Sequence, residues 1–334
     1  MLMKIHITNL YGMNSRGTQI ISQRSVVKVA KELGFKEMSL YVYRVQSDTE
    51  GELRKRLDGI TSSVEDGDIV IAQLPSWNLT RYDKALLDVI RMRRNVKIAV
   101  FIHDFVPMMF GGTELDYHQT IEVYNMADLL IVPSESLLDF LQEKGLKVEK
   151  VLFQPMWDVP FSGELQIPEF RRQIFFSGSP ERFQFVFSWN YDIPLKCFTY
   201  DNFEVKGPNI QAEGWRNATE LLTEYARGGF GLVWEQTSQA HYYRYNQPHK
   251  LCTYLAAGIP VIMQRGLLHE RTVQERGLGF VVDSLEEAAD IVKRISEEEY
   301  QELVSNIRNI SFLIREGFFT KKLLIDTVNY LMLG

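Results

Sequence analysis

The chain has 334 residues, of which 45% are hydrophobic and 24% are charged, and its formal net charge is −6. This length predicts two domains, and the composition is typical of a globular protein in water. The acidic balance argues against a nucleic-acid-binding protein, and no apolar run approaches the ~20 residues that a membrane-spanning helix needs.

The N-terminal half alternates short apolar strands with amphipathic helices. We expect strands at residues 4–8, 38–42, 68–73, 96–102 and 129–132, and helices at 19–33, 52–57, 82–93, 114–126 and 134–145. Continuous apolar strands between helices indicate a parallel sheet covered on both faces, and such a sheet binds ligands at the carboxyl ends of its strands. The loops 9–18, 75–78 and 103–113 should therefore share one edge of the sheet.

The same alternation restarts after residues 153–169, which we interpret as the crossing between two domains. We expect strands at 173–177, 194–199, 230–234, 259–263 and 279–282, helices at 181–189, 215–226, 246–257 and 268–276, and a long helix opened by a capping box at Ser284-Leu-Glu-Glu287. The expected fold class is α/β, with two Rossmann-like domains, 1–155 and 170–315, facing a central cleft. A helix in 316–334 should cross back.

The first residues and the cysteines indicate a reducing compartment. Residues 1–9 alternate as a strand does, whereas a signal peptide has a charged start and an apolar core. Cys197 and Cys252 form no disulfide framework and fall in segments with the pattern of buried structure. We therefore expect a cytoplasmic protein.

The most informative stretch, residues 246–262, reads Asn-Gln-Pro-His-Lys-Leu-Cys-Thr-Tyr-Leu-Ala-Ala-Gly-Ile-Pro-Val-Ile. Asn246 is a good helix N-cap, Pro248 suits a first turn and Gly258 suits a helix end. Free backbone N–H groups at a helix start favour an anion, and Lys250 adds a full positive charge. The alternative is an ordinary amphipathic helix with a solvated lysine.

Two further segments suggest contact with a phosphate. Arg182 follows the first strand of the second domain, and a cation in the first turn of a helix opposes the helix dipole unless an anion lies nearby. Arg182 and Lys250, at two helix starts on one edge, together predict a diphosphate site. Gly17 and Thr18 let the backbone approach a phosphate or a sugar, although a tolerant surface loop is an equal alternative, since the glycine-rich nucleotide-binding patterns are missing.

The sequence also offers candidates for acid–base chemistry and for sugar binding. His103 and Asp104 close its most apolar strand, a good position for an acid or a base; the alternative is a turn-starting aspartate and a histidine satisfied by backbone. The aromatic residues in 241–245, with Trp77 and Trp157, offer flat faces for a sugar or a base, although aromatic side chains more often serve packing.

No metal site is expected from the sequence. Asp66-Gly-Asp68 has the spacing of a divalent-cation site, but it precedes its strand and lies at the wrong end of the sheet. The six histidines lack zinc spacing.

The pattern Pro-x-Lys-Leu-x-x-Tyr-Leu-Ala-Ala-Gly-Ile-Pro-Val-Ile resembles the donor-binding helix of GT-B glycosyltransferases. Over the whole chain, from Ile7-Thr-Asn-Leu through Phe101-Ile-His-Asp-Phe to Gly258-Ile-Pro-Val, the sequence is similar to one group of them. These are the bacterial glucosyltransferases that extend the first N-acetylglucosamine (GlcNAc) on serine-rich repeat adhesins.

The resemblance implies a UDP-glucose donor, a GlcNAc-modified Ser/Thr-rich acceptor protein, no metal and a homo-oligomer, as a tetramer. Lys250 matches the family's phosphate-binding lysine, Arg182 its basic residue after the strand, and Gly17 and Thr18 its loop over the donor. Thr253 stands where many GT-B enzymes carry a ribose-binding glutamate, so that ribose contacts would come partly from elsewhere, such as loop 211–215.

The resulting hypothesis places the donor diphosphate among Arg182, Lys250 and the N–H groups near Asn246, Gly17 and Thr18. Asp104 would be the acceptor-side base, with His103 beside it. Two alternatives stay open: a non-catalytic nucleotide-sugar-binding partner of another transferase, and an enzyme of the same fold that epimerises a UDP-sugar.

Overall fold

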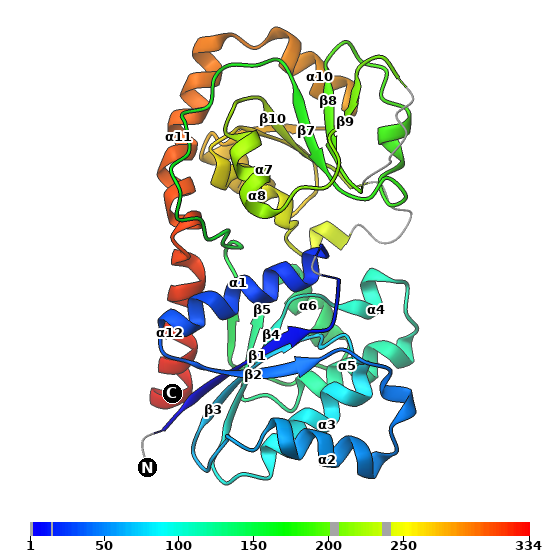
Figure 1. Cartoon of the computed structure of the whole chain (residues 1–334), viewed down its shortest axis with the longest axis vertical. Coiled ribbons are helices and arrows are strands. Elements are labelled where there is room, and N and C mark those ends of the chain that lie inside the picture. Colours follow the sequence, from blue (N-terminus) through cyan, green and yellow to red (C-terminus); the bar gives the residue numbers. More distant parts are fainter. Residues whose placement is uncertain (1–2, 15, 201–206, 236–241) are drawn as a thin grey trace. The chain divides into compact units, whose positions relative to one another are not determined.

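The computed structural model describes the chain apart from residues 1–2, 15, 201–206 and 236–241, and it leaves out the side chains of Thr18 and Gln19. The chain divides into two compact units, one of Met1–Pro155 with Phe319–Gly334 and one of Met156–Phe318. Each unit is a parallel sheet flanked by helices (Figure 1). No helix in the described ranges is long and apolar enough to cross a membrane.

The first unit contains a six-stranded parallel sheet. Its strands are β1 (Ile5–Tyr11), β2 (Lys36–Tyr41), β3 (Ile69–Leu74), β4 (Lys97–Ile102), β5 (Leu129–Val132) and β6 (Val151–Phe153). Its helices are α1 (Thr18–Glu32), α2 (Glu50–Ile60), α3 (Thr80–Arg91), α4 (Val106–Met109), α5 (Glu114–Tyr124), α6 (Glu135–Glu143) and nearly all of α12 (Phe318–Leu333). The strand order is β2-β1-β3-β4-β5-β6, so the loops after β1, β3 and β4 share the carboxyl edge.

The second unit contains another six-stranded parallel sheet. Its strands are β7 (Ile174–Ser177), β8 (Leu195–Phe198), β9 (Ile210–Ala212), β10 (Phe230–Val233), β11 (Val261–Gln264) and β12 (Gly279–Val282). Its helices are α7 (Ala218–Tyr225), α8 (His249–Ala257), α9 (Glu270–Glu275), α10 (Leu285–Arg294) and α11 (Glu297–Arg315). The order β9-β8-β7-β10-β11-β12 is that of dinucleotide-binding sheets, in which the ligand binds where the strand order reverses, here between β7 and β10.

The predicted α/β alternation is confirmed in both units. Three short elements were not predicted, namely α4, β6 and β9. Each has only three or four residues, which is too short for a period of 2 or 3.6 to appear in the sequence.

The helix expected at 181–189 is wrong. Only Gln184–Phe187 forms a 3-10 turn, and Arg182 precedes it in a turn rather than in a helix. Phe183 and Phe185 both belong to the buried core of the second unit. Two residues along an α-helix are separated by about 200°, so a helix here could not bury both rings against one sheet. The argument that Arg182 opposes a helix dipole therefore falls away.

Helix α8 begins later than expected, and Asn246 is not its N-cap. The helix starts at His249, directly after Pro248. A proline disfavours the helical conformation for the residue before it, so Gln247 cannot start the helix. The predicted end is correct, because Gly258 has a φ of 89°, in the left-handed region that favours glycine.

The long helix expected from Ser284 is two helices. The Ser284 hydroxyl accepts a hydrogen bond from the Glu287 backbone N–H at 3.0 Å, but the Glu287 carboxylate accepts from Asp283 instead of completing the capping box. Helix α10 ends at Arg294, and a complete capping box of Ser296 and Glu299 then starts α11. The second N-cap divides the stretch.

Helix α12 packs on the first unit. Its Lys321 ammonium lies 3.0 Å from the carboxylate of Glu32 on α1. Nearer its end, the ring of Tyr330 lies 5.0 Å from the Lys150 ammonium. The C-terminal helix therefore packs with the N-terminal domain, although the whole second unit lies between them in the sequence.

Gly231 on β10 leaves room for the ring of Tyr254 on α8. An added Cβ would lie 2.1 Å from the ring of Tyr254, which is fully buried. We expect Gly231→Ala to lower the free energy of unfolding by about 1–3 kcal/mol, because the ring has no space to move away. Gly59→Ala, where an added Cβ meets nothing within 4 Å, is the control and should be neutral or stabilising. Urea unfolding measures both; an unchanged stability of Gly231→Ala would contradict this packing.

Candidate active site

The second unit brings Arg182 and Lys250 onto the same two aromatic rings. The Lys250 ammonium lies 4.0 Å from the ring centre of Phe183 and 5.8 Å from that of Tyr243. The Arg182 guanidinium lies 5.4 and 5.5 Å from the same two centres. One cation follows β7 and the other lies in the first turn of α8, so two distant segments supply neighbouring positive charges.

The Lys250 ammonium is buried and has no hydrogen-bond partner among the described residues. Burial lowers the pKa of Lys250 well below its usual value, the charge of Arg182 lowers it further, and Glu235 opposes the change. A buried ammonium beside a second cation is costly unless an anion joins them. The pair is therefore suited to a ligand that carries adjacent negative charges, such as a diphosphate.

Glu235 is a residue of this site that the sequence interpretation missed. It lies two residues after the end of β10, it is 4% exposed, and its carboxylate accepts a hydrogen bond from the Tyr243 backbone N–H at 3.2 Å. Arg182 after β7 and Glu235 after β10 thus flank the point where the strand order reverses. A charged residue directly after a fully apolar strand was the signal that could have found it.

Two other predicted donor-binding residues are engaged inside the second unit. The Asn246 amide donates to the Tyr242 hydroxyl at 3.0 Å, and its oxygen accepts from the Gln247 backbone N–H at 2.8 Å. The Thr253 hydroxyl donates to the His249 carbonyl oxygen at 3.1 Å. Thr253 can therefore offer a ribose hydroxyl only a lone pair.

The imidazole of His249 was not predicted as part of a site. Its Nε2 atom is buried without a hydrogen-bond partner among the described residues, and burial lowers the pKa of His249 to about 4. The ring is therefore neutral at pH 7.

Gly17 and Thr18 belong to the first unit. Gly17 is the N-cap of α1, with an extended backbone, and its carbonyl oxygen accepts from the Ile21 N–H at 3.3 Å. Thr18 is the first residue of α1, and its side chain lies outside the described atoms. The backbone N–H groups of this first helical turn follow the loop after β1.

His103, at the end of β4, is held between two side chains of the first unit. The Gln73 amide nitrogen donates to the carbonyl oxygens of Thr8 and Gln23, so its oxygen faces His103 Nε2, 2.9 Å away. Nε2 therefore carries the proton, and Nδ1 accepts from the Ser22 hydroxyl at 3.2 Å. His103 is 2% exposed, so its imidazole is enclosed by the first unit.

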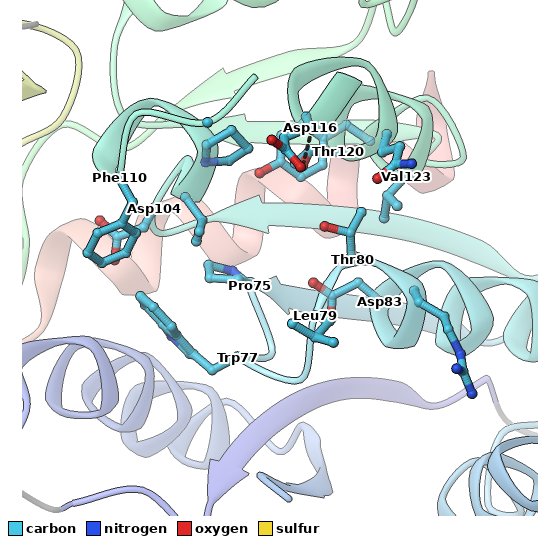
Figure 2. A pocket seen from close by; sticks show the side chains of 16 residues that line it. Pro75, Trp77, Leu79, Thr80, Asp83, Asp104, Phe110, Asp116, Thr120 and Val123 are labelled. Carbon is cyan, nitrogen blue, oxygen red and sulfur yellow. Dashed lines mark hydrogen bonds between the residues drawn. The ribbon is translucent and has the colours of Figure 1, made fainter. Parts of the chain in front are cut away.

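Asp104, the next residue, lines a cavity of about 500 Å³ within the first unit (Figure 2). The segment after β3, the segment 104–112 and helix α5 form its walls. Figure 2 shows Asp104 with Trp77 and Phe110 on one side of the cavity and Asp83 with Thr80 on the other. The cavity thus lies at the carboxyl edge of the first sheet, where a ligand site was predicted. Of the aromatic residues predicted to bind a sugar or a base, Trp77 lines it.

The remaining candidates from the sequence have structural partners or lie outside the described residues. The carboxylate of Asp66 accepts from Arg94 at 2.8 Å, and that of Asp68 lies 3.0 Å from His6 Nε2. The Trp157 indole N–H donates to the Gln247 carbonyl oxygen at 3.2 Å. Of the aromatic run, His241 lies outside the described residues.

The two parallel α/β units have the fold of GT-B glycosyltransferases. The structure is similar to that of sucrose-phosphate synthase from Thermosynechococcus elongatus, with a TM-score of 0.71 and 12% identity over 99% of each chain. It is also similar to Anabaena HepE in complex with UDP, with a TM-score of 0.68 and 11% identity over 98% of this chain and 100% of HepE. The predicted GT-B fold is confirmed.

The chain belongs to the Glucosyltransferase 3-like family. The N-terminal domain of that family matches residues 4–156 and its C-terminal domain matches residues 174–327. Glucosyltransferase 3 of Streptococcus gordonii is 46% identical and that of Streptococcus parasanguinis 41% identical, each over 98% of both chains. The chain is therefore a glycosyltransferase, and the resemblance inferred from the sequence is confirmed.

Proposed function

We propose that this glycosyltransferase moves glucose from UDP-glucose onto a GlcNAc that is already O-linked to a Ser/Thr-rich repeat adhesin, in the cytoplasm and without a metal ion. The observation that carries the proposal is the buried Lys250 ammonium, which lies beside Arg182 and has no hydrogen-bond partner among the described residues. The full-length similarity to streptococcal Glucosyltransferase 3 supports glucose as the transferred sugar. HepE, which has the same fold, has been observed with UDP-glucose.

Glucosyl transfer requires positive charge near the departing UDP. The acceptor hydroxyl oxygen forms a bond to the anomeric carbon of glucose while the bond from that carbon to the diphosphate oxygen breaks. Lys250 and Arg182 stabilise the charge that develops on the departing UDP, which is the task of a divalent cation in metal-dependent transferases. Asp104 takes the proton of the acceptor hydroxyl.

The family resemblance implies both the GlcNAc-bearing acceptor and the homotetramer. A Ser/Thr-rich acceptor that already bears GlcNAc makes this enzyme the second in a sequence of sugar additions. The pneumococcal O-GlcNAc transferase GtfA, which resembles this chain in fold with a TM-score of 0.52, represents the class of enzyme that supplies such an acceptor. We propose a homotetramer as the assembly.

Mass spectrometry of the acceptor tests the function. The protein is incubated with UDP-glucose and EDTA, together with either a GlcNAc-bearing Ser/Thr-rich peptide or the bare peptide. We expect one hexose to be added to the GlcNAc peptide only, at the same rate without EDTA. Binding of UDP without any transfer would instead indicate a non-catalytic partner of another transferase, and conversion of the free UDP-sugar would indicate an epimerase.

Asp104→Asn is expected to lower kcat for glucosyl transfer by about 10²-fold, because an amide cannot accept the proton of the acceptor hydroxyl. Binding of UDP, measured by calorimetry, should not change. Asp88→Asn, on the exposed face of α3, is the matched control. A kcat within about three-fold of the wild type would remove Asp104 from the mechanism.

A further inference from the structure

The cavity of the first unit has the size and composition of a small-molecule site. Its volume of about 500 Å³ falls in the range of ligand pockets, and most of its lining is apolar with a few polar groups. Trp77 and Phe110 contribute aromatic surface, and Phe110 is 61% exposed. Trp77 and Leu79 hold positive φ angles of 59° and 74°, a strained backbone for such side chains that often marks a functional segment.

Two residues that line the cavity carry a polar group with few or no hydrogen-bond partners among the described residues. The Trp77 indole nitrogen is buried and makes no hydrogen bond to any described residue. Asp83 is only 6% exposed, and Ser76 is its one hydrogen-bond partner among the described residues, through its hydroxyl and through its backbone N–H at the long distances of 3.3 and 3.5 Å. Burial raises the pKa of Asp83 to about 7. An unused donor and a largely unused acceptor, set among apolar side chains, call for a ligand that supplies both kinds of group.

The charge of the lining restricts that ligand. Asp83, Asp104 and Asp116 line the cavity, and Arg81 is the one cation among the described residues that line it. Three carboxylates disfavour a phosphate-bearing ligand, so the nucleotide donor does not belong here. A neutral ring with hydroxyl groups at its edge and C–H groups on its faces matches the apolar walls, the unpaired indole N–H and the remaining acceptor capacity of the Asp83 carboxylate.

We propose that this cavity binds the neutral pyranose ring of the acceptor, with Trp77 supplying an apolar surface and one N–H donor and Asp83 accepting hydrogen bonds from ring hydroxyls. The assignment rests on the proposed function, in which the acceptor already carries a sugar. Asp104 then lies in the same cavity as the hydroxyl that reacts, while Asp83 and Trp77 bind the ring and take no part in proton transfer.

Saturation-transfer NMR with a methyl glycoside of GlcNAc tests this assignment without turnover. The wild type and the surface control Asp88→Asn are expected to bind the glycoside. Trp77→Ala and Asp83→Asn are expected to bind it at least about ten-fold more weakly, and Trp77→Phe, which keeps a ring but loses the N–H, should fall between. The assignment is overturned if the wild type does not bind the glycoside, or if Trp77→Ala and Asp83→Asn, folded by circular dichroism, both bind it as the wild type does.

A transfer assay on the same variants separates this assignment from the proposed function. If glycoside binding depends on Trp77 and Asp83 but the wild type transfers no glucose, the assignment of the cavity as a sugar site stands and the proposed reaction is wrong. If both variants transfer glucose to the GlcNAc peptide with an acceptor KM within about two-fold of the wild type, the proposed reaction stands and the cavity is not the acceptor site. The expected result is an acceptor KM raised at least about ten-fold with an unchanged KM for UDP-glucose.

Discussion

Lys250→Met is expected to lower kcat/KM for UDP-glucose by about 10³-fold, because it removes a preorganised charge at the departing diphosphate. The ligand-free variant should be at least as stable as the wild type. Its thioether side chain can pack on the rings of Phe176 and Phe183, which lie 4.3 and 4.0 Å from the ammonium in the wild type. Loss of function with retained or increased stability distinguishes a binding lysine from a structural one.

The lowered pKa of Lys250 determines how the stability difference between Lys250→Met and the wild type changes with pH. Because the pKa of Lys250 in the folded state is lowered from 10.5, the wild type loses stability as the pH falls from 10.5 toward the folded-state pKa. The stability advantage of Lys250→Met should therefore be largest at neutral and acidic pH. Lys293→Met, at an exposed lysine of α10, is the control. Near-normal turnover of Lys250→Met at low donor concentration would contradict the assignment.

Asp83→Asn is expected to stabilise the protein above pH 7 and to have little effect near pH 4. The folded-state pKa of Asp83 is raised from 3.8 to about 7, so the folded protein holds a proton that the unfolded chain has lost. The wild type therefore loses stability as the pH rises from about 4 to about 7, and the cost is complete above pH 7. At about 1.4 kcal/mol for each pKa unit, the full difference is about 4 kcal/mol.

Urea unfolding of both proteins between pH 4 and 8 measures this difference. Of the groups that interact with Asp83, Tyr82 and Tyr124 have pKa values raised by burial and stay protonated throughout this range. Asp88→Asn should leave the pH profile unchanged. Parallel profiles for Asp83→Asn and the wild type would mean that the carboxylate is not desolvated. Because the Asp83 carboxylate lowers the free energy of unfolding above pH 7, ligand binding explains its presence better than folding does.

The fold could be predicted because its signals are local. Apolar strands of four to seven residues, separated by helices with one apolar face, are sufficient to indicate two parallel sheets. Where tertiary packing decided the outcome, the prediction was wrong. Residues 181–189 have enough apolar content for a helix, but the need to bury Phe183 and Phe185 in one core excludes it. Two nearby capping signals, Ser284 and Ser296, compete in a stretch that was expected to be one helix.

The candidate site was only partly predictable. Lys250 and Arg182 were found because cations near glycine-rich or helix-starting segments are visible in the sequence. Asp83 was missed because an isolated acidic residue gives no sign of its burial, whereas Glu235 could have been found from its position after an apolar strand. Asp83 in particular lies in the first turn of α3, where a solvated carboxylate is the ordinary expectation. Only the surrounding chain shows that this carboxylate faces a cavity.

The central claim is that Arg182 and Lys250 together hold the diphosphate of the donor. Calorimetric titration of UDP, with EDTA present, into the wild type, Arg182→Met, Lys250→Met and the double variant tests it most directly. If both cations bind one diphosphate, the loss of either should weaken UDP binding at least about ten-fold. The two losses should not be additive in the double variant. UDP affinity unchanged in Lys250→Met, or strictly additive losses, would contradict a shared site.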